Sequence, residues 1–471
     1  MGIQQMMLGT SPGGDTYWIL SDGKDTSGYK MQYDGVYVDT AGNVYAYGKT
    51  NEPWNSSNMW SRDHMCLNKY DKHGTNIFYK RYSNNVTTNG HEQTYDGLQV
   101  FSDGNLMLAN KSGMGQASAV KCNTSGSVLW KKRYGTDNTY GIQGGVQSIA
   151  IDSSNNCMFV GGGLTIYNGS GSGNISLWQL SSSGSLVNDW NVAVSATGTY
   201  GVSFVRMQYD SSGNLYIVGS RGMGSGTGSQ DKDGYIMKLN SSMVIQWQHT
   251  LGSSGYYPIE TYDDLAFDSS DNVYCVGTHR DGNSRHYAFI AKYNSSGTLQ
   301  WQKKYGNGTQ NLYFSSIDID SDDNVYCSGY VDVYGSSPHW VKLNTSGVLQ
   351  YKRAMRELYS NNSSADWMRS MKVFGDAIYL VGRRYTGSVR HYGWIAKLPK
   401  EGIATATYGS KYEISEPNYT MSNTSFTEDR ATVNFSISEV TNKSVFNGTM
   451  SVNTATWPED IYSIYDVDFG Q

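Results

Sequence analysis

The 471-residue chain contains little charge and little proline. Charged residues make up 16% of it and only 7 residues are proline, whereas ordinary soluble domains carry roughly 25% charged residues. Aromatic residues make up 13%, and their side chains bury large apolar areas. Because a disordered chain is rich in charge and proline and poor in aromatics, the composition excludes disorder.

Long apolar runs and an excess of positive charge are also missing. No stretch approaches the roughly 18 consecutive apolar residues of a membrane-spanning helix, and residues 1–14 lack the basic start and apolar run of a signal peptide. The net charge is −5, from 36 basic and 41 acidic residues, so no positive field draws the protein to nucleic acid. We therefore expect no signal peptide, no membrane insertion and no nucleic-acid binding.

The sequence lacks a recognisable catalytic constellation. The 8 histidines form no His-Glu-x-x-His motif, and no Gly-x-Ser-x-Gly elbow stands beside a strand-helix pattern. None of the 5 cysteines belongs to a Cys-x-x-Cys pair, so each is expected to be a small buried side chain. Carboxylate pairs such as Asp263 and Asp264 occur, but a sequence does not give the separation that paired-acid catalysis requires. We expect neither enzyme activity nor a cofactor.

The sequence is instead rich in glycine and tyrosine, with 54 and 38 residues, and it repeats itself. One phrase recurs: an alternating strand, an Asp-led turn, an Asn, and an aromatic strand that ends in Gly. It reads VDTAGNVYAYG at residues 38–48, YDSSGNLYIVG at 209–219 and FDSSDNVYCVG at 267–277. The Asn or its equivalent stands at positions 43, 105, 156, 214, 272, 324 and 377. Seven units of similar length therefore follow one another without a break.

A second phrase lies between consecutive copies of the first: an apolar strand ending in Lys, a turn with Gly, and an aromatic anchor, as in IAKYNSSGTLQW at residues 290–301. Each unit thus holds four strands, a to d, with short a–b and c–d turns. Four antiparallel strands repeated about every 40 to 60 residues are typical of a propeller blade. The sequence predicts an all-β fold, a seven-bladed β-propeller of four-stranded antiparallel blades over residues 15–400. The alternative is a β-helix, whose coils are shorter and lack hairpin turns.

An aromatic anchor marks strand d in six units. The anchors are Phe78, Trp130, Trp190, Trp247, Trp301 and Tyr351. Trp18 precedes the turn aspartate of the first unit by 21 residues, the spacing that Trp247 has from the next turn aspartate. Residues 15–21 are therefore predicted to be strand d of the last blade, which would remove an open sheet edge. In the alternative, IATATYG after Gly402 supplies this strand and the N-terminal stretch is an outer addition.

The two ends of the chain lie outside the repeat. Alternating stretches at residues 431–440 and 461–470 predict strands, and about 65 residues suffice for a small β unit. We expect residues 1–14 to be an N-terminal docking extension and residues 401–471 to be a small C-terminal β appendage.

The predicted topology separates short turns from long loops. In an up-and-down meander the a–b and c–d turns share one face, which we call the turn face. The longer b–c and d–a loops share the other, which we call the variable face. Loops of this kind carry function on rigid scaffolds. Their aromatic rings can stack on sugars, and their Arg groups can bond to hydroxyls or carboxylates. The candidate ligand-binding residues within or beside the b–c loops are Trp54, Trp60, Tyr167, Arg280, Arg285, His286, Tyr334, Arg383, Arg384, Tyr385 and Arg390. In the alternative, these side chains pack under their own loops.

One acidic cluster, DIDSDDN at residues 318–324, has the alternation of a calcium loop. Asp318, Asp320 and Asp322 are its weak candidate metal ligands. The segment lacks the Gly and terminal Glu of an EF-hand, and other units place a single Asp there, so a hairpin turn is the expected structure.

The repeat, with DSSGN at residues 210–214, KYNSSG at 292–297 and the following Trp301, resembles the β-propeller repeat of secreted bacterial and phage proteins. The opening MGIQQMMLG resembles the start of tail-associated structural proteins of marine, cyanophage-like tailed phages. The resemblance implies a non-enzymatic virion protein, made in the host cytoplasm and associated with the tail or fibre. It would bind other virion proteins through its N-terminal segment and C-terminal β unit, and a host-surface glycan or protein through the variable loops.

Two other functions fit the same sequence. One is a purely architectural virion spacer or decoration protein, and the other is an extracellular bacterial adhesin or polysaccharide-processing protein. The sequence shows no long fibre-forming repeat or coiled coil, which argues against a self-sufficient trimeric fibre and leaves homo-oligomer formation open.

Overall fold

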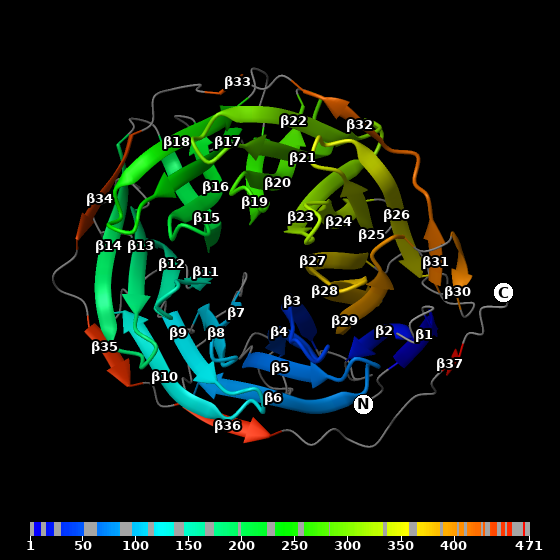
Figure 1. The fold of residues 1–471 in the computed structure, drawn as a ribbon, viewed down its shortest axis with the longest axis horizontal. Coiled ribbons are helices and arrows are strands. Elements are labelled where there is room, and N and C mark those ends of the chain that lie inside the picture. Colours follow the sequence, from blue (N-terminus) through cyan, green and yellow to red (C-terminus); the bar gives the residue numbers. More distant parts are fainter. Residues whose placement is uncertain are drawn as a thin grey trace. The chain divides into compact units, whose positions relative to one another are not determined.

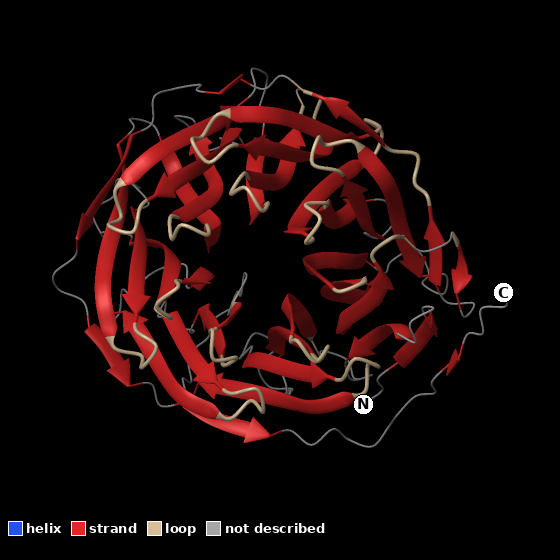
Figure 2. Cartoon of the chain, in the orientation of Figure 1, coloured by secondary structure: helices blue, strands red, loops and turns tan. Residues whose placement is uncertain are grey.

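A computed structural model describes most of the repeat. The residues that it describes are 4–10, 16–22, 30–50, 64–84, 97–111, 117–135, 146–164, 174–195, 199–223, 231–252, 259–281, 283–332, 337–357, 365–386, 390–402, 405–408, 412–424, 427–428, 434–439, 444–447, 450–454 and 465–466. Every regular element in this part of the chain is a β-strand (Figure 2). No helix that could cross a membrane occurs in it. The strands form seven four-stranded antiparallel blades of a β-propeller, so the predicted fold class is confirmed.

The chain falls into two compact units, and the first consists of Met1–Asn85, Gln310–Tyr419 and Ser451–Gln471. It contains blades 1, 6 and 7 (Figure 1). Blade 1 is β3 (Met31–Val38), β4 (Val44–Thr50), β5 (His64–Tyr70) and β6 (Asn76–Asn84). Blade 6 is β23 (Asn311–Ile319), β24 (Val325–Asp332), β25 (Ser337–Leu343) and β26 (Leu349–Glu357). Blade 7 is β27 (Ala365–Phe374), β28 (Ala377–Thr386), β29 (Arg390–Pro399) and β2 (Thr16–Asp22).

The second unit consists of Val86–Thr309 and Thr420–Met450 and contains blades 2 to 5. Blade 2 is β7 (Leu98–Val100), β8 (Leu106–Lys111), β9 (Ala117–Cys122) and β10 (Val128–Gly135). Blade 3 is β11 (Val146–Ile151), β12 (Cys157–Leu164), β13 (Asn174–Leu180) and β14 (Leu186–Ser195). Blade 4 is β15 (Thr199–Tyr209), β16 (Leu215–Met223), β17 (Asp231–Leu239) and β18 (Ile245–Gly252). Blade 5 is β19 (Ile259–Phe267), β20 (Val273–Arg280), β21 (His286–Tyr293) and β22 (Leu299–Gly306).

The fourth strand of blade 7 comes from the start of the chain. β2 pairs antiparallel with β29, with Trp18 opposite Lys397 and Asp22 opposite Gly393. The strand after Gly402, β30 (Ala406–Tyr408), pairs with β31 (Tyr412–Ser415) instead. β1 (Gln4–Thr10) lies along the free side of β2, so the N-terminal 22 residues contribute two strands to this sheet.

The C-terminal segment adds one further strand to each blade, and we call its strands β31 to β37 the edge strands. β31, β32 (Thr420–Asn423), β33 (Thr427–Glu428), β34 (Asn434–Glu439), β35 (Ser444–Asn447) and β36 (Met450–Thr454) pair with strand d of blades 6, 5, 4, 3, 2 and 1, in that order. β37 (Tyr465–Asp466) pairs with β1 of the blade 7 sheet. The described part of residues 401–471 is therefore distributed over the blades and not gathered into one appended unit, because each short strand gains its ladder hydrogen bonds from a different strand d.

The a–b turns explain the Asp-led phrase. The carboxylate of Asp210 accepts hydrogen bonds from the backbone N–H groups of Ser212 (3.0 Å) and Asn214 (2.8 Å). This turn also needs a residue with positive φ, which is Gly213 (φ 78°) here and Asn155 (φ 60°) in blade 3. Asp, Asn and Gly are the residues that supply these two properties.

The Gly that ends the phrase is required by close backbone approach. Strand a carries a bulge opposite it in blades 1, 5, 6 and 7. A Cβ on Gly48, Gly277, Gly329 or Gly382 would lie 1.8–2.0 Å from a carbonyl oxygen just before that bulge on strand a. A side chain does not fit there, so the repeat keeps glycine.

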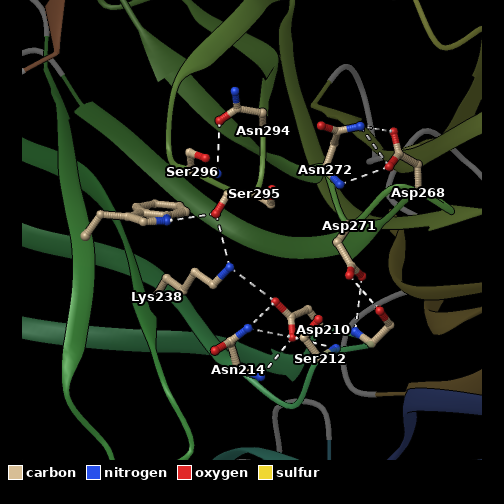
Figure 3. A network of polar contacts seen from close by, with 12 residues as sticks. Asp210, Ser212, Asn214, Lys238, Asp268, Asp271, Asn272, Asn294, Ser295 and Ser296 are labelled. Atoms are coloured by element: carbon tan, nitrogen blue, oxygen red, sulfur yellow. Dashed lines mark hydrogen bonds and ion pairs between the residues drawn. The ribbon is translucent and has the colours of Figure 1, made fainter.

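The Lys and the aromatic anchor of the second phrase join neighbouring blades. In blade 4, Trp247 Nε1 donates a hydrogen bond to the carbonyl oxygen of Ser295 in the c–d turn of blade 5 (3.2 Å). Lys238 Nζ donates to the same oxygen (3.1 Å) and lies 3.3 Å from Asp210 Oδ2 (Figure 3). Trp18 and Lys397 of blade 7 donate in the same way to the carbonyl oxygen of Lys72 in blade 1 (3.2 and 3.5 Å). These repeated residues therefore hold blades together.

Each unit has its own apolar core. Trp18, Tyr33 and Trp340 are fully buried in the first unit. In the second, Phe159 and Trp178 stack with their ring centroids 5.5 Å apart. All five cysteines are buried and outside any disulfide, as the strand positions of these residues led us to expect.

Candidate functional site

The structure describes about half of the predicted ligand-binding residues. Trp54, Trp60, Tyr167 and Tyr334 lie outside the described residues. Tyr385 and Arg390 lie on β28 and β29, but their side chains are not described. Arg280, Arg285, His286, Arg383 and Arg384 are described with their side chains. They fall into two groups, one on blade 5 and one on blade 7.

The blade 5 group lies around the turn between β20 and β21. Arg280 is opposite His286 in the ladder, and its Nη2 donates a hydrogen bond to Ser284 Oγ (2.8 Å). Asp281 Oδ1 accepts the backbone N–H of Arg285 (2.9 Å), which makes an Asx turn like those of the turn face. Arg280 therefore stabilises this turn, and Arg285 is the exposed cation of the group.

A buried pair that sequence reasoning missed lies behind this turn. His279 Nδ1 is 2.9 Å from Glu260 Oε1, and both side chains are buried. The imidazole also stacks on Tyr287, with centroids 6.0 Å apart. Glu260 and His279 lie on different strands, β19 and β20, so no local spacing in the sequence relates them.

The blade 7 group continues into a stack of rings that crosses from blade 6. Tyr313 of β23 stacks on Tyr330 of β24 with centroids 4.6 Å apart, and Tyr330 stacks on Trp367 of β27 at 5.1 Å. We call these three residues the aromatic ladder. The guanidinium groups of Arg383 and Arg369 lie 4.9 and 5.5 Å from the Trp367 ring centroid, which is cation–π distance.

The aromatic ladder lies on the variable face and is half-buried. Tyr313 and Trp367 are near the starts of strands a, while Tyr330 and Arg383 are near the ends of strands b. All four side chains are intermediate in exposure. Of these, only Arg383 was predicted, because Tyr313 and Trp367 belong to strands a and the stacking of Tyr330 depends on how two blades pack.

A basic cluster adjoins the aromatic ladder through Arg383. It consists of Lys30, Lys49, Arg383 and His391. The backbone of Lys30 forms a β-bridge with His391. Burial, followed by the positive charges of Arg383, Lys30 and Lys49, lowers the pKa of His391 to about 4. His391 is therefore neutral at pH 7, and the three other residues supply the charge. Arg384 follows Arg383 on β28 and lies opposite Tyr392 in the ladder.

A buried carboxyl group lies in the first unit at the variable-face end of β2. Asp22 Oδ2 accepts hydrogen bonds from the hydroxyls of Tyr33 and Tyr70, and Asn68 Nδ2 donates to Tyr70 Oη (2.9 Å). Burial raises the pKa of Asp22 to about 6, although these hydrogen bonds act in the opposite direction. Among the described residues Asp22 Oδ1 has no hydrogen-bond partner. This network ties blade 7 to blade 1.

The acidic cluster of blade 6 is occupied by protein donors. Asp318 bonds to Lys372 Nζ (3.0 Å) and to the backbone N–H of Val373 (2.7 Å). Asp320 takes part in the Asx turn: burial acts to raise its pKa, but hydrogen bonds from Asn324 and other donors lower it below the usual value. Asp322 is exposed, and its backbone N–H donates to Asp320. The described residues contain no group of three or more side chains arranged to hold a metal ion.

The turn face presents a repeated apolar feature. Ile77, Leu129, Val187, Val244 and Val348 are 44–56% exposed, and each lies in or beside a c–d turn. They occupy one of two alternating positions at the start of strand d in blades 1, 2, 3, 4 and 6.

Comparisons with known proteins assign neither a family nor a function to the chain. No protein-family model and no curated protein matches the chain. The polysaccharide lyase Uly1 has 9% identity and a TM-score of 0.44 over 78% of this chain and 90% of its own. The apocarotenoid oxygenase of Synechocystis has 10% identity and a TM-score of 0.44 over 86% of this chain and 97% of its own. The tail fiber of a Staphylococcus aureus phage has 8% identity and a TM-score of 0.20 over 70% of this chain and 94% of its own. These neighbours include enzymes and a tail fiber, and at such values they assign no activity to this chain.

Proposed function

We propose that the protein is a non-enzymatic, tail- or fibre-associated virion protein that binds a host-surface glycan through its variable face. The virion assignment is supported by the resemblance of the opening MGIQQMMLG to tail-associated proteins. The binding assignment is supported by the side chains at the variable-face ends of blades 6, 7 and 1. The fold itself is compatible with many functions, so the assignment of a function depends on this site.

The observation that carries the proposal is the contrast between the two faces. On the turn face, the repeated Asp, Lys and Trp side chains make their polar contacts within turns and between blades, as in Asp210, Lys238 and Trp247. On the variable face, blades 6 and 7 carry the aromatic ladder and two arginines that other blades do not repeat. Half-exposed rings beside guanidinium groups are the usual chemistry of sugar recognition.

The test is binding of the full-length protein to arrays of bacterial surface glycans and to host cell envelopes. We expect binding that Trp367→Ala weakens by about tenfold or more, since aromatic anchors carry a large share of binding energy. Tyr37→Ala is the matched control, because Tyr37 is a half-buried ring paired with Tyr45 (5.8 Å) at the turn-face end of blade 1. Equal loss in both variants, or release of reducing ends from a glycan, would contradict the proposal.

A second candidate function is architectural. It is favoured by Leu129, Val187 and Val244, exposed aliphatic side chains at the c–d turns of the second unit, which would pack on a neighbouring virion protein. Absence of binding to every host surface, together with tight binding to another virion protein that Val187→Asp and Val244→Asp abolish, would support this function over glycan binding.

A further inference from the structure

We infer that the aromatic ladder and the basic cluster together bind an acidic glycan, one whose sugars carry carboxylate, sulfate or phosphate groups. The inference rests on the proposed function, since it names the ligand class of the same face. It is carried by the convergence of cations from two blades onto one end of the first unit, beside partly exposed rings.

The positive charges come together from separate strands. Lys30 immediately precedes β3 and is exposed, Lys49 is near the end of β4, and Arg383 is near the end of β28. The bridge between Lys30 and His391 fixes the start of blade 1 against blade 7. Burial and the charges of the three cations keep His391 neutral at pH 7, so its ring can serve as a hydrogen-bonding group there.

Two described carboxyl groups on the adjoining strands β2 and β3 are buried and bound within the protein, whereas Asp332, at the end of β24, is exposed. Asp22 of β2 accepts hydrogen bonds from Tyr33 and Tyr70, and Asp34 of β3 accepts one from Gln32. Lys30 is exposed and Lys49 and Arg383 are half-buried, whereas the carboxyl groups of Asp22 and Asp34 stay inside. A surface region of one sign attracts ligands of the opposite sign.

Arg383 connects the charge to the rings. Its guanidinium lies 4.9 Å from the Trp367 centroid, and stacking of this kind orients the planar donor fork for a carboxylate, sulfate or phosphate. The Trp367 ring is half-buried, so part of it reaches solvent. A sugar can thus contact the indole with its C–H groups while its acid group bonds to Arg383. A neutral glycan uses only the first contact, and a non-carbohydrate anion uses only the second.

The experiment measures binding of the full-length protein to polygalacturonate, dextran sulfate and neutral dextran at about 50 mM and 300 mM salt, a range over which exposed charges become screened. We expect binding to one or both acidic polymers, weaker binding at high salt, and none to dextran. The two acidic polymers separate carboxylate from sulfate recognition. The double variant Lys30→Gln, Arg383→Gln should weaken binding by about tenfold or more, as expected for loss of charge-assisted bonds.

Two further variants keep the result interpretable. Lys72→Gln removes an exposed cation from the turn face of the same unit and should leave binding unchanged. Arg383→Lys keeps the charge but loses the fork, and binding should fall between that of the wild type and Arg383→Gln. Equal binding to dextran, insensitivity to salt, or equal loss in Lys72→Gln would each overturn the inference.

The outcomes also separate this inference from the proposed function. If the wild type binds host envelopes and the double variant binds them equally well, the acidic-ligand inference is wrong and host binding stands. If the wild type binds the acidic polymers through the cluster but binds no host envelope, the inference holds and the host-binding function is wrong.

Discussion

At the residue scale, the repeat does not predict the hydrogen-bond partners of the buried Asp22 carboxyl group. The hydroxyls of Tyr33 and Tyr70 converge on it from blade 1, although the chain separates them from Asp22 by 11 and 48 residues. Sequence reasoning identified Arg383 as a candidate because it lies beside a loop. It missed Tyr330 and Trp367, because their stacking depends on how two blades pack.

The first prediction concerns the charge of Asp22. Its folded-state pKa is about 6 against an ordinary 3.8, so the folded protein holds this proton more tightly than the unfolded chain. The stabilisation of the folded state by the protonated Asp22 is full below pH 4 and is lost as the pH rises through 6. Asp22→Asn does not titrate, and between pH 4 and pH 8 its stability should improve relative to the wild type by about 3 kcal/mol.

The measurement is urea unfolding of both proteins across this pH range. Asp268→Asn is a control of opposite sign: burial acts to raise the pKa of Asp268, but hydrogen bonds from Asn272 and Lys292 lower it below the usual value. That variant should have a lower free energy of unfolding than the wild type at neutral pH, and the difference should shrink in acid. A pH-independent effect of Asp22→Asn would contradict the assignment.

The second prediction concerns the glycine that ends strand b. In Gly277→Ala the new Cβ would lie 2.0 Å from the carbonyl oxygen of Thr261, so the backbone must shift. We expect a loss of about 1–3 kcal/mol in the free energy of unfolding, as is typical of overpacking. Gly234→Ala is the matched control, since the nearest atom to its Cβ would be in the Tyr262 ring, at 3.3 Å. Equal stability of the two variants in urea unfolding would refute the explanation.

At the element scale, most of the fold could be predicted because its signals are local. Alternation, Asp-led turns and the Lys and aromatic anchors recur within each unit, and each phrase defines one hairpin. The sequence did not show why the anchors recur, since Trp247 and Lys238 act on the next blade. Blade 3 departs from the pattern of the anchors. Asn188 occupies the position after the c–d turn that Trp130 and Trp247 have in their blades, and Trp190 lies two residues later.

The third prediction tests the blade joint. Trp247→Phe keeps an aromatic ring but removes the hydrogen bond to the carbonyl oxygen of Ser295, so the free energy of unfolding should fall by about 1 kcal/mol. The control is Trp301→Phe in blade 5, because Trp301 Nε1 has no hydrogen-bond partner among the described residues. The thermal midpoint should fall more in Trp247→Phe, and a larger fall in Trp301→Phe would argue against the joint.

At the scale of the whole molecule, the edge strands were the least predictable part. Alternation predicted strands in residues 401–471, but not that they would pair one by one with blades 6 to 1 and then with β1 of the blade 7 sheet. These partners lie far away in the chain, and strands of two to six residues carry little pairing information. The physical consequence is clear, since a strand d without its edge strand is an open sheet edge.

The fourth prediction follows from these edges. A chain that ends at residue 402 lacks every edge strand, so its strands d should pair with other molecules and form soluble oligomers or aggregates. A chain that ends at residue 466 keeps all the edge strands and should behave like the full-length protein. Light scattering during size-exclusion chromatography distinguishes the two. A monodisperse 402-residue protein of unchanged stability would show that the edge strands are dispensable.

The central claim is that the variable face of the first unit binds the ligand, and covalent footprinting of the full-length protein tests it most directly. With polygalacturonate or dextran sulfate present, labelling should fall at Trp367 and at Lys30, and should not change at the turn-face residues Tyr37 and Lys72. Protection of the turn face with unchanged labelling of Trp367 and Lys30 would contradict the account.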